Sequence, residues 1–231
     1  MQTRLKLDNW KPRIELPQPI DSPTGTQEAL SSYLYRLKRA LSSEIHLIIE
    51  ELRLSYPTLN KREFISCLLD SNTIPFVYSG SGISAQQIST VLSKMVPAHE
   101  WETHTLNLFE NTNDFAAPLR LGRRAGWCRS CLSDAHATDT AIYWPLAWLT
   151  KGYDQCHTHK TKLCFHCDIC GEAKSGFNTN LPLDICGYCK APLYDRGIPD
   201  NTRQLELWKQ LRSDTIITRL SCQALDLNAP D

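Results

Sequence analysis

The sequence predicts a mainly α-helical N-terminal domain with a helix-turn-helix-like pair, followed by two small zinc-binding modules of the knuckle or ribbon type and a C-terminal helix. Three observations predict this fold class. Apolar residues recur at helical spacing within residues 24–118, eight of the ten cysteines crowd into residues 128–189, and a last helical pattern follows them. The composition, 42% hydrophobic and 22% charged, is ordinary for a folded globular protein of 231 residues.

The order of these patterns divides the chain into four parts. We expect an extended N-terminal arm over residues 1–25, a helical domain over 26–118, a tandem zinc-binding region over 119–197, and a C-terminal helix and tail over 198–231. The arm has several prolines and no hydrophobic period, so we expect it to be disordered or to lie along a partner.

The first helix is predicted within "TGTQEALSSYLYRLKRAL", residues 24–41. Thr24 and Gln27 have the spacing of a capping box at its start. Arg36, Lys38 and Arg39 spread over the solvent side of its second half, where they form either a solvated basic surface or a docking patch. One helical face collects the apolar residues Leu30, Tyr33, Leu34, Leu37 and Leu41.

Similar patterns predict further helices over residues 43–54, 60–70 and 84–95 and a short one around 101–109. Ser84 and Gln87 again have capping-box spacing. The helices at 60–70 and 84–95 resemble a helix-turn-helix with a long connection, and the second has polar residues suited to a DNA groove. The alternative is a structural bundle with a polar outer face.

The cysteine spacings predict two zinc sites, because a C-x-x-C turn presents two thiolates at the separation that zinc needs. "CDICG" and "CGYC", with 15 residues between the two pairs, fit an all-cysteine zinc-ribbon site. "CRSC" then needs two ligands from residues 156–164, and Cys156 with His159 keeps the knuckle spacing, although Cys164 could replace either one. The predicted ligands are Cys128, Cys131, Cys156 and His159 for one site, and Cys167, Cys170, Cys186 and Cys189 for the other.

Both zinc ions are expected to be structural, since protein ligands can fill every position and leave none for water. The chain has no H-x-E or H-E-x-x-H motif and no G-x-x-x-x-G-K-[ST] phosphate-binding loop, so we expect no enzyme. In "HEWETH", five positions along a helix would turn His104 away from His99, which argues against a metal pair there. We expect these two histidines to be surface or hydrogen-bonded residues.

The 25 basic and 25 acidic residues balance, so nucleic-acid contact would need a local patch. Arg120, Arg123 and Arg124 form the densest basic run and are the main candidates, with a solvated surface as the alternative. Trp144 and Trp148 have the spacing of a core pair; stacking on a base is the alternative. Without a secretion signal or an apolar run of about 18 residues, we expect the protein in the cytoplasm.

In their order and spacing, five motifs resemble the TniQ/TnsD family of transposon target-selection proteins. The motifs are "TQEALSSYLYRLKRA", like the family's G-E-S-L-x-S-x-L-x-R, then "GWCRSCL", "YWPLAWLT", "CHTHKTKL" and "CDICG…CGYCKAPL". They cover residues 26–194. Cys164 departs from the family pattern, which usually has an apolar or basic residue there.

The resemblance implies an adaptor that marks a target site and recruits the AAA+ ATPase TnsC, which in turn admits the transposase. The chain resembles the short class, which in CRISPR-associated transposons is brought to target DNA by an effector complex with its guide RNA. The resemblance also implies a helix-turn-helix domain followed by zinc modules that use the eight ligands named above. The alternative function is a stand-alone zinc-containing DNA-binding regulator, for which the balanced charge is less suited.

Overall fold

The computed structural model describes residues 16–21, 26–41, 73–96, 99–107, 120–122, 124–174 and 176–194. The predicted helices at 43–54 and 60–70, most of the arm, Arg123 and the C-terminal helix lie outside these residues, so the first half of the helix-turn-helix-like pair is not tested. The described elements are α1 (Leu30–Leu41), β1 (Thr73–Pro75), η3 (Phe76–Ser79), α4 (Ile83–Met95), η4 (Trp101–His104), α5 (Arg129–Ala137), α6 (Leu146–Leu149) and β2 (Gly176–Asn178). The described part is therefore helical with few strands, as predicted.

Helix α1 confirms the predicted apolar face, since all five of its predicted apolar residues are buried. Its predicted capping box is wrong, because Gln27 lies three residues before the helix begins. The Gln27 side-chain amide instead donates a hydrogen bond to the carbonyl of Thr103, at 3.0 Å. Ala29 supplies the carbonyl that accepts the first hydrogen bonds, from the amides of Ser32 and Tyr33 at 2.9 and 3.0 Å.

Helix α4 confirms the predicted helix at residues 84–95, and Ile88, Val91 and Leu92 on its inner face are buried. It begins at Ile83, after Gly82, which makes no side-chain capping bond. Ser84 therefore lies inside the first turn and cannot form the capping box that its spacing with Gln87 predicted.

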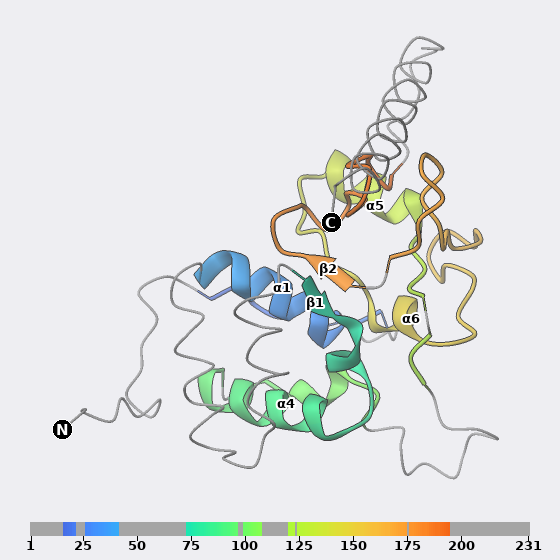
Figure 1. The fold of residues 1–231 in the computed structure, drawn as a ribbon. Coiled ribbons are helices and arrows are strands. Elements are labelled where there is room, and N and C mark those ends of the chain that lie inside the picture. Colours follow the sequence, from blue (N-terminus) through green and yellow to red (C-terminus); the bar gives the residue numbers. More distant parts are fainter. Residues whose placement is uncertain are drawn as a thin grey trace, which may run out of the picture.

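Two strands tie the helical part of the chain to the cysteine-rich part (Figure 1). Strand β1 pairs antiparallel with β2, so Ile74 lies opposite Phe177 although about a hundred residues separate them in sequence. Both side chains are fully buried. Both strands lie against α1.

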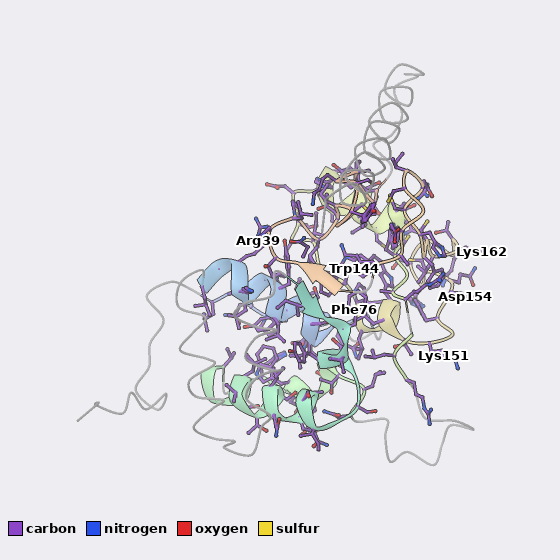
Figure 2. The ribbon with its side chains drawn as sticks, in the orientation of Figure 1. Arg39, Phe76, Trp144, Lys151, Asp154 and Lys162 are labelled. Carbon is purple, nitrogen blue, oxygen red and sulfur yellow. The ribbon has the colours of Figure 1, made fainter. Side chains whose placement is uncertain are left out.

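One hydrophobic core joins all the described elements, with Trp144 at its centre. The Trp144 ring lies 5.3 Å from Phe177, 5.5 Å from Trp148, 6.0 Å from Trp127 and 6.4 Å from Phe76, between ring centroids. Figure 2 shows Trp144 and Phe76 between α4 and the cysteine-rich segments. Because Trp144 and Trp148 are buried, they form a core pair and cannot stack on a nucleic-acid base.

Within the described residues, no helix is both long enough and apolar enough to cross a membrane.

Candidate metal centres

The first centre joins the start of α5 to a tight turn at residues 156–160. Cys128 is the N-cap residue of α5 and Cys131 lies in its first turn, while Cys156 and His159 belong to the turn. The Sγ atom of Cys131 lies 3.5 Å from Cys156 Sγ and 3.2 Å from His159 Nδ1. Cys128 Sγ is 3.6 Å from the same nitrogen. All four ligand atoms lie within 4.8 Å of one another.

A carboxylate outside this group orients the imidazole. The Nε2 atom of His159 lies 2.8 Å from Asp134 Oδ2, so its N–H donates to that carboxylate and Nδ1 presents its lone pair to the three sulfur atoms. Metal-binding histidines in proteins are commonly held by such a second hydrogen bond, which fixes the tautomer and the ring orientation.

The second centre is built from two successive turns and contains four cysteines. Cys167 Sγ lies 3.6 Å from Cys189 Sγ, and Cys170 Sγ lies 3.7 Å from Cys186 Sγ. Four thiolates around one zinc ion at about 2.3 Å form a tetrahedron whose corners are about 3.8 Å apart, so these separations fit the ion. The neighbouring Cys167 thiol lowers the pKa of Cys186 by hydrogen bonding to its thiolate.

Three of the four ligand pairs lie in turns with the same backbone pattern. In each turn, the first cysteine accepts a hydrogen bond at its carbonyl from the residue four positions later, at 2.7–3.1 Å. That later residue has a left-handed conformation in every case: Lys160 with φ 56°, Gly171 with φ 75° and Lys190 with φ 64°. The turns are therefore three copies of one zinc-knuckle geometry.

The structure thus gathers the eight residues that the spacing selected into the two groups that it predicted. The first group offers three thiolates and one imidazole and the second four thiolates, and these are donor sets that structural zinc uses. Both groups are positioned to bind metal. Neither group leaves a ligand position open, which fits a structural role better than a catalytic one.

Cys164, which the sequence left as an alternative ligand, belongs to neither group. Its backbone forms a two-way bridge with Trp127, at 2.8 and 2.9 Å, and this bridge holds it between the centres. The structure therefore groups Cys156 and His159, and not Cys164, with Cys128 and Cys131.

The arginines that the sequence singled out for contacts have different surroundings. Arg36 forms an ion pair with Glu28 at 2.5 Å, and its other nitrogen donates to the carbonyl of Gln18. The Arg39 guanidinium lies over the Tyr35 ring, and Arg124 hydrogen bonds to His166. Arg39, Arg120 and Arg124 are all exposed, whereas Arg36 is partly buried, so of the four candidate arginines that the structure describes these three remain candidates for contact with a partner.

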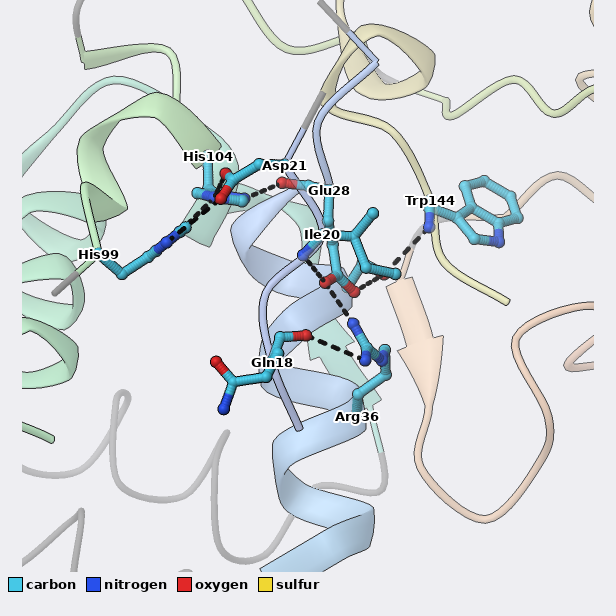
Figure 3. A network of polar contacts seen from close by, with 9 residues as sticks. Gln18, Ile20, Asp21, Glu28, Arg36, His99, His104 and Trp144 are labelled. Carbon is cyan, nitrogen blue, oxygen red and sulfur yellow. Dashed lines mark hydrogen bonds and ion pairs between the residues drawn. The ribbon is translucent and has the colours of Figure 1, made fainter. Parts of the chain in front are cut away.

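A buried polar network at the start of α1 was missed by sequence reasoning (Figure 3). The Glu28 carboxylate accepts hydrogen bonds from Arg36, from the Ser32 hydroxyl at 2.9 Å and from the Ile20 amide at 3.4 Å. The Ser32 hydroxyl oxygen in turn accepts from the amide of Trp144 at 3.0 Å. Burial raises the pKa of Glu28 to about 7, and Arg36 limits that rise.

The expectation that His104 turns away from His99 is wrong. Residues 101–104 form a short 3₁₀ helix and His99 lies before it, so the angular spacing of an α-helix does not apply. The two Nε2 atoms lie 2.7 Å apart, and Asp21 lies beside both rings. His104 is fully buried and hydrogen bonds through Nδ1 to the carbonyl of Glu28.

The TniQ family model matches residues 19–163, which is more than half of the chain and includes α1, α4, α5, α6 and the whole first centre. No curated protein matches the chain.

Proposed function

The chain belongs to the TniQ family, and from this membership we propose that it acts as a target-selection adaptor in DNA transposition. In this proposal it is not an enzyme. It links a target-bound complex, formed by a CRISPR effector and its guide RNA, to a TnsC-type AAA+ ATPase, and so directs integration of the transposon DNA. The family match is the observation that carries the proposal, since it makes the chain a transposition-associated protein.

The two metal centres support a structural rather than a chemical role. We propose that each binds one zinc ion, held by Cys128, Cys131, Cys156 and His159 in one case and by Cys167, Cys170, Cys186 and Cys189 in the other. Zinc in such filled sites supplies folding free energy and fixes loops in place. The loops that carry the ligands pack on the same core as α1 and α4, so bound ions would stabilise both parts together.

The charge balance favours a bridging role over tight independent binding to DNA. Phosphate neutralisation supplies most of the affinity of a free-standing DNA-binding protein, and such proteins concentrate basic residues on one face. This chain has 25 basic and 25 acidic residues. Within α4, the hydroxyl hydrogens of Thr90 and Ser93 are donated to carbonyls of their own helix, which leaves fewer donors for reading bases.

A reconstitution experiment tests the proposal. The purified chain is mixed with the TnsC-type ATPase and with the guide complex bound to its target DNA, and co-elution is measured by size-exclusion chromatography. We expect the chain to join the two components, and we expect Cys164→Ser to do the same because its thiol belongs to neither centre. Cys186→Ser removes one metal ligand and should abolish the bridging.

The alternative function, a stand-alone DNA-binding regulator, makes an opposite prediction. Such a protein would bind one naked DNA sequence tightly at physiological salt and would not join the ATPase to the guide complex. An electrophoretic mobility shift measured with a random library of duplexes distinguishes the two. Selection of a single tight sequence, together with failure to co-elute, would replace the adaptor proposal by the regulator.

A further inference from the structure

A third cluster of metal-binding side chains lies on the far side of α1 from the cysteine centres. Asp21, His99 and His104 each offer one ligand atom, and these atoms lie within 4.8 Å of one another. Figure 3 shows the three side chains converging: Asp21 comes from the segment before α1, His99 from the segment that leads into η4, and His104 from η4 itself. The family resemblance and the cysteine spacing do not account for this cluster.

The tautomer of His104 is fixed by its surroundings. Its Nδ1 atom lies 2.5 Å from the carbonyl oxygen of Glu28, which can only accept, so Nδ1 carries the hydrogen. Its Nε2 atom therefore presents a lone pair to Asp21 and His99. Burial also lowers the pKa of His104. A backbone carbonyl that orients the second nitrogen in this way is a common feature of metal-binding histidines.

The atoms that meet this lone pair are also electron-rich. Asp21 Oδ1 lies 3.2 Å from His104 Nε2, and Asp21 Oδ2 lies 3.4 Å from His99 Nδ1. The Nε2 atoms of the two histidines are 2.7 Å apart. A neutral His99 has one N–H, which it can donate either to His104 Nε2 or to the Asp21 carboxylate. At least one pair of acceptor atoms therefore lies in contact with no hydrogen between them. A cation among the three side chains, either a bound metal ion or a second proton on His99, removes this conflict.

The site is shielded on one side and open on the other. The Trp101 ring lies 4.6 Å from the ring of His99 and 5.7 Å from that of His104, between centroids, and both Trp101 and His104 are buried. The Asp21 side chain is 64% exposed, which gives an ion in solution access to the cluster. Two imidazoles and a carboxylate with one position left for water form a donor set that suits zinc.

We propose that Asp21, His99 and His104 form a third metal site, which binds one zinc ion and fastens the segment before α1 to η4. The site has no thiolate, so it binds zinc more weakly than the two cysteine centres and loses it first to a chelator. The site is inferred from the geometry of these three residues alone, so this inference does not depend on the transposition role.

Zinc stoichiometry tests the site. The full-length chain is saturated with zinc, dialysed briefly, and its zinc per chain is measured by plasma mass spectrometry. We expect three ions for the unmodified chain and two for His99→Gln. The control His157→Gln should keep three, because His157 is an exposed histidine that belongs to none of the three groups. Saturation of the unmodified chain at two ions, or three ions in His99→Gln, would overturn the proposal.

A second variant and a spectroscopic readout guard against a folding defect. Asp21 is exposed, so Asp21→Asn should leave the fold intact while weakening the third ion at least tenfold. Cobalt added to the chain with both cysteine centres filled by zinc should give d–d absorption without sulfur-to-metal charge transfer, and Asp21→Asn should reduce it. Charge-transfer absorption, or an equal signal in Asp21→Asn, would show that cobalt binds elsewhere and would overturn the proposal.

Discussion

At the scale of single residues, each zinc knuckle depends on one position with a left-handed backbone. The position holds Lys160, Gly171 and Lys190 in the three turns, with φ between 56° and 75°. Residues with a Cβ atom adopt this conformation at a cost of about 1–2 kcal/mol, and glycine adopts it without that cost. The two lysines show that the knuckle geometry is strong enough to impose the conformation.

Gly171 allows this cost to be measured without a steric clash. A Cβ atom at Gly171 or at Gly187 would meet no atom within 4 Å, but only Gly171 has a positive φ. We expect Gly171→Ala to lower the free energy of unfolding by about 1 kcal/mol. The matched control Gly187→Ala should be neutral or slightly stabilising, because it restricts the unfolded chain. Denaturant unfolding at saturating zinc measures both, and equal effects of the two changes would refute the account.

Ligand assignment shows where residue-level prediction succeeds and where it fails. The cysteine pairs could be assigned from sequence, because a knuckle is a local structure whose two ligands are three positions apart. The closeness of His99 and His104 could not be predicted, since an α-helix was expected there and the chain forms a 3₁₀ turn after His99. Asp21 carried no signal at all, because its neighbours in space are about eighty residues away in sequence.

At the scale of elements, the opening motif of α1 is a buried hydrogen-bonded unit. Glu28 lies two residues before the helix, Ser32 and Arg36 follow at intervals of four residues, and the Ser32 hydroxyl connects this group to the backbone of Trp144. The family motif at the start of this helix therefore corresponds to a physical connection between α1 and the tryptophan segment. Periodicity predicted the helix and its apolar face, but it did not predict that this polar side is also buried.

We expect Arg36 to stabilise the fold rather than to contact a partner. Arg36→Ala would leave the Glu28 carboxylate buried without its ion pair, and we expect a loss of about 3 kcal/mol in the free energy of unfolding. Arg124 is exposed and makes only a surface contact with His166, so Arg124→Ala should cost less than about 1 kcal/mol. Thermal and denaturant unfolding compare the two variants.

The stability of Arg36→Ala has a predictable pH dependence. Glu28 already has a pKa raised to about 7 in the native protein, and removing Arg36 raises it further. The folded variant then binds more protons than the unfolded chain at neutral pH, so its stability continues to fall as the pH rises above 7. The difference between Arg36→Ala and the unmodified chain should therefore be larger at pH 8 than at pH 6. A difference that is constant with pH would mean that the pKa of Glu28 does not change when Arg36 is removed.

At the scale of the whole molecule, the helices and the metal centres share one core. The sequence predicts a helical region followed by a zinc-binding region, and the described residues of both contribute to this core. The pairing of β1 with β2 and the central position of Trp144 could not be predicted, because both depend on contacts between segments far apart in sequence. Loss of metal from the cysteine centres should therefore disturb the helices as well.

Metal replacement tests most directly the central claim that the cysteine-bound ions hold an adaptor surface and perform no chemistry. Metal is removed with a strong chelator, the chain is reloaded with zinc or with cadmium, which also favours thiolate ligands, and affinity for the TnsC-type ATPase and integration in a reconstituted reaction are measured. The account predicts that the metal-free chain loses both and that either ion restores both. Cadmium that restores binding without integration, or a metal-free chain that remains fully active, would contradict it.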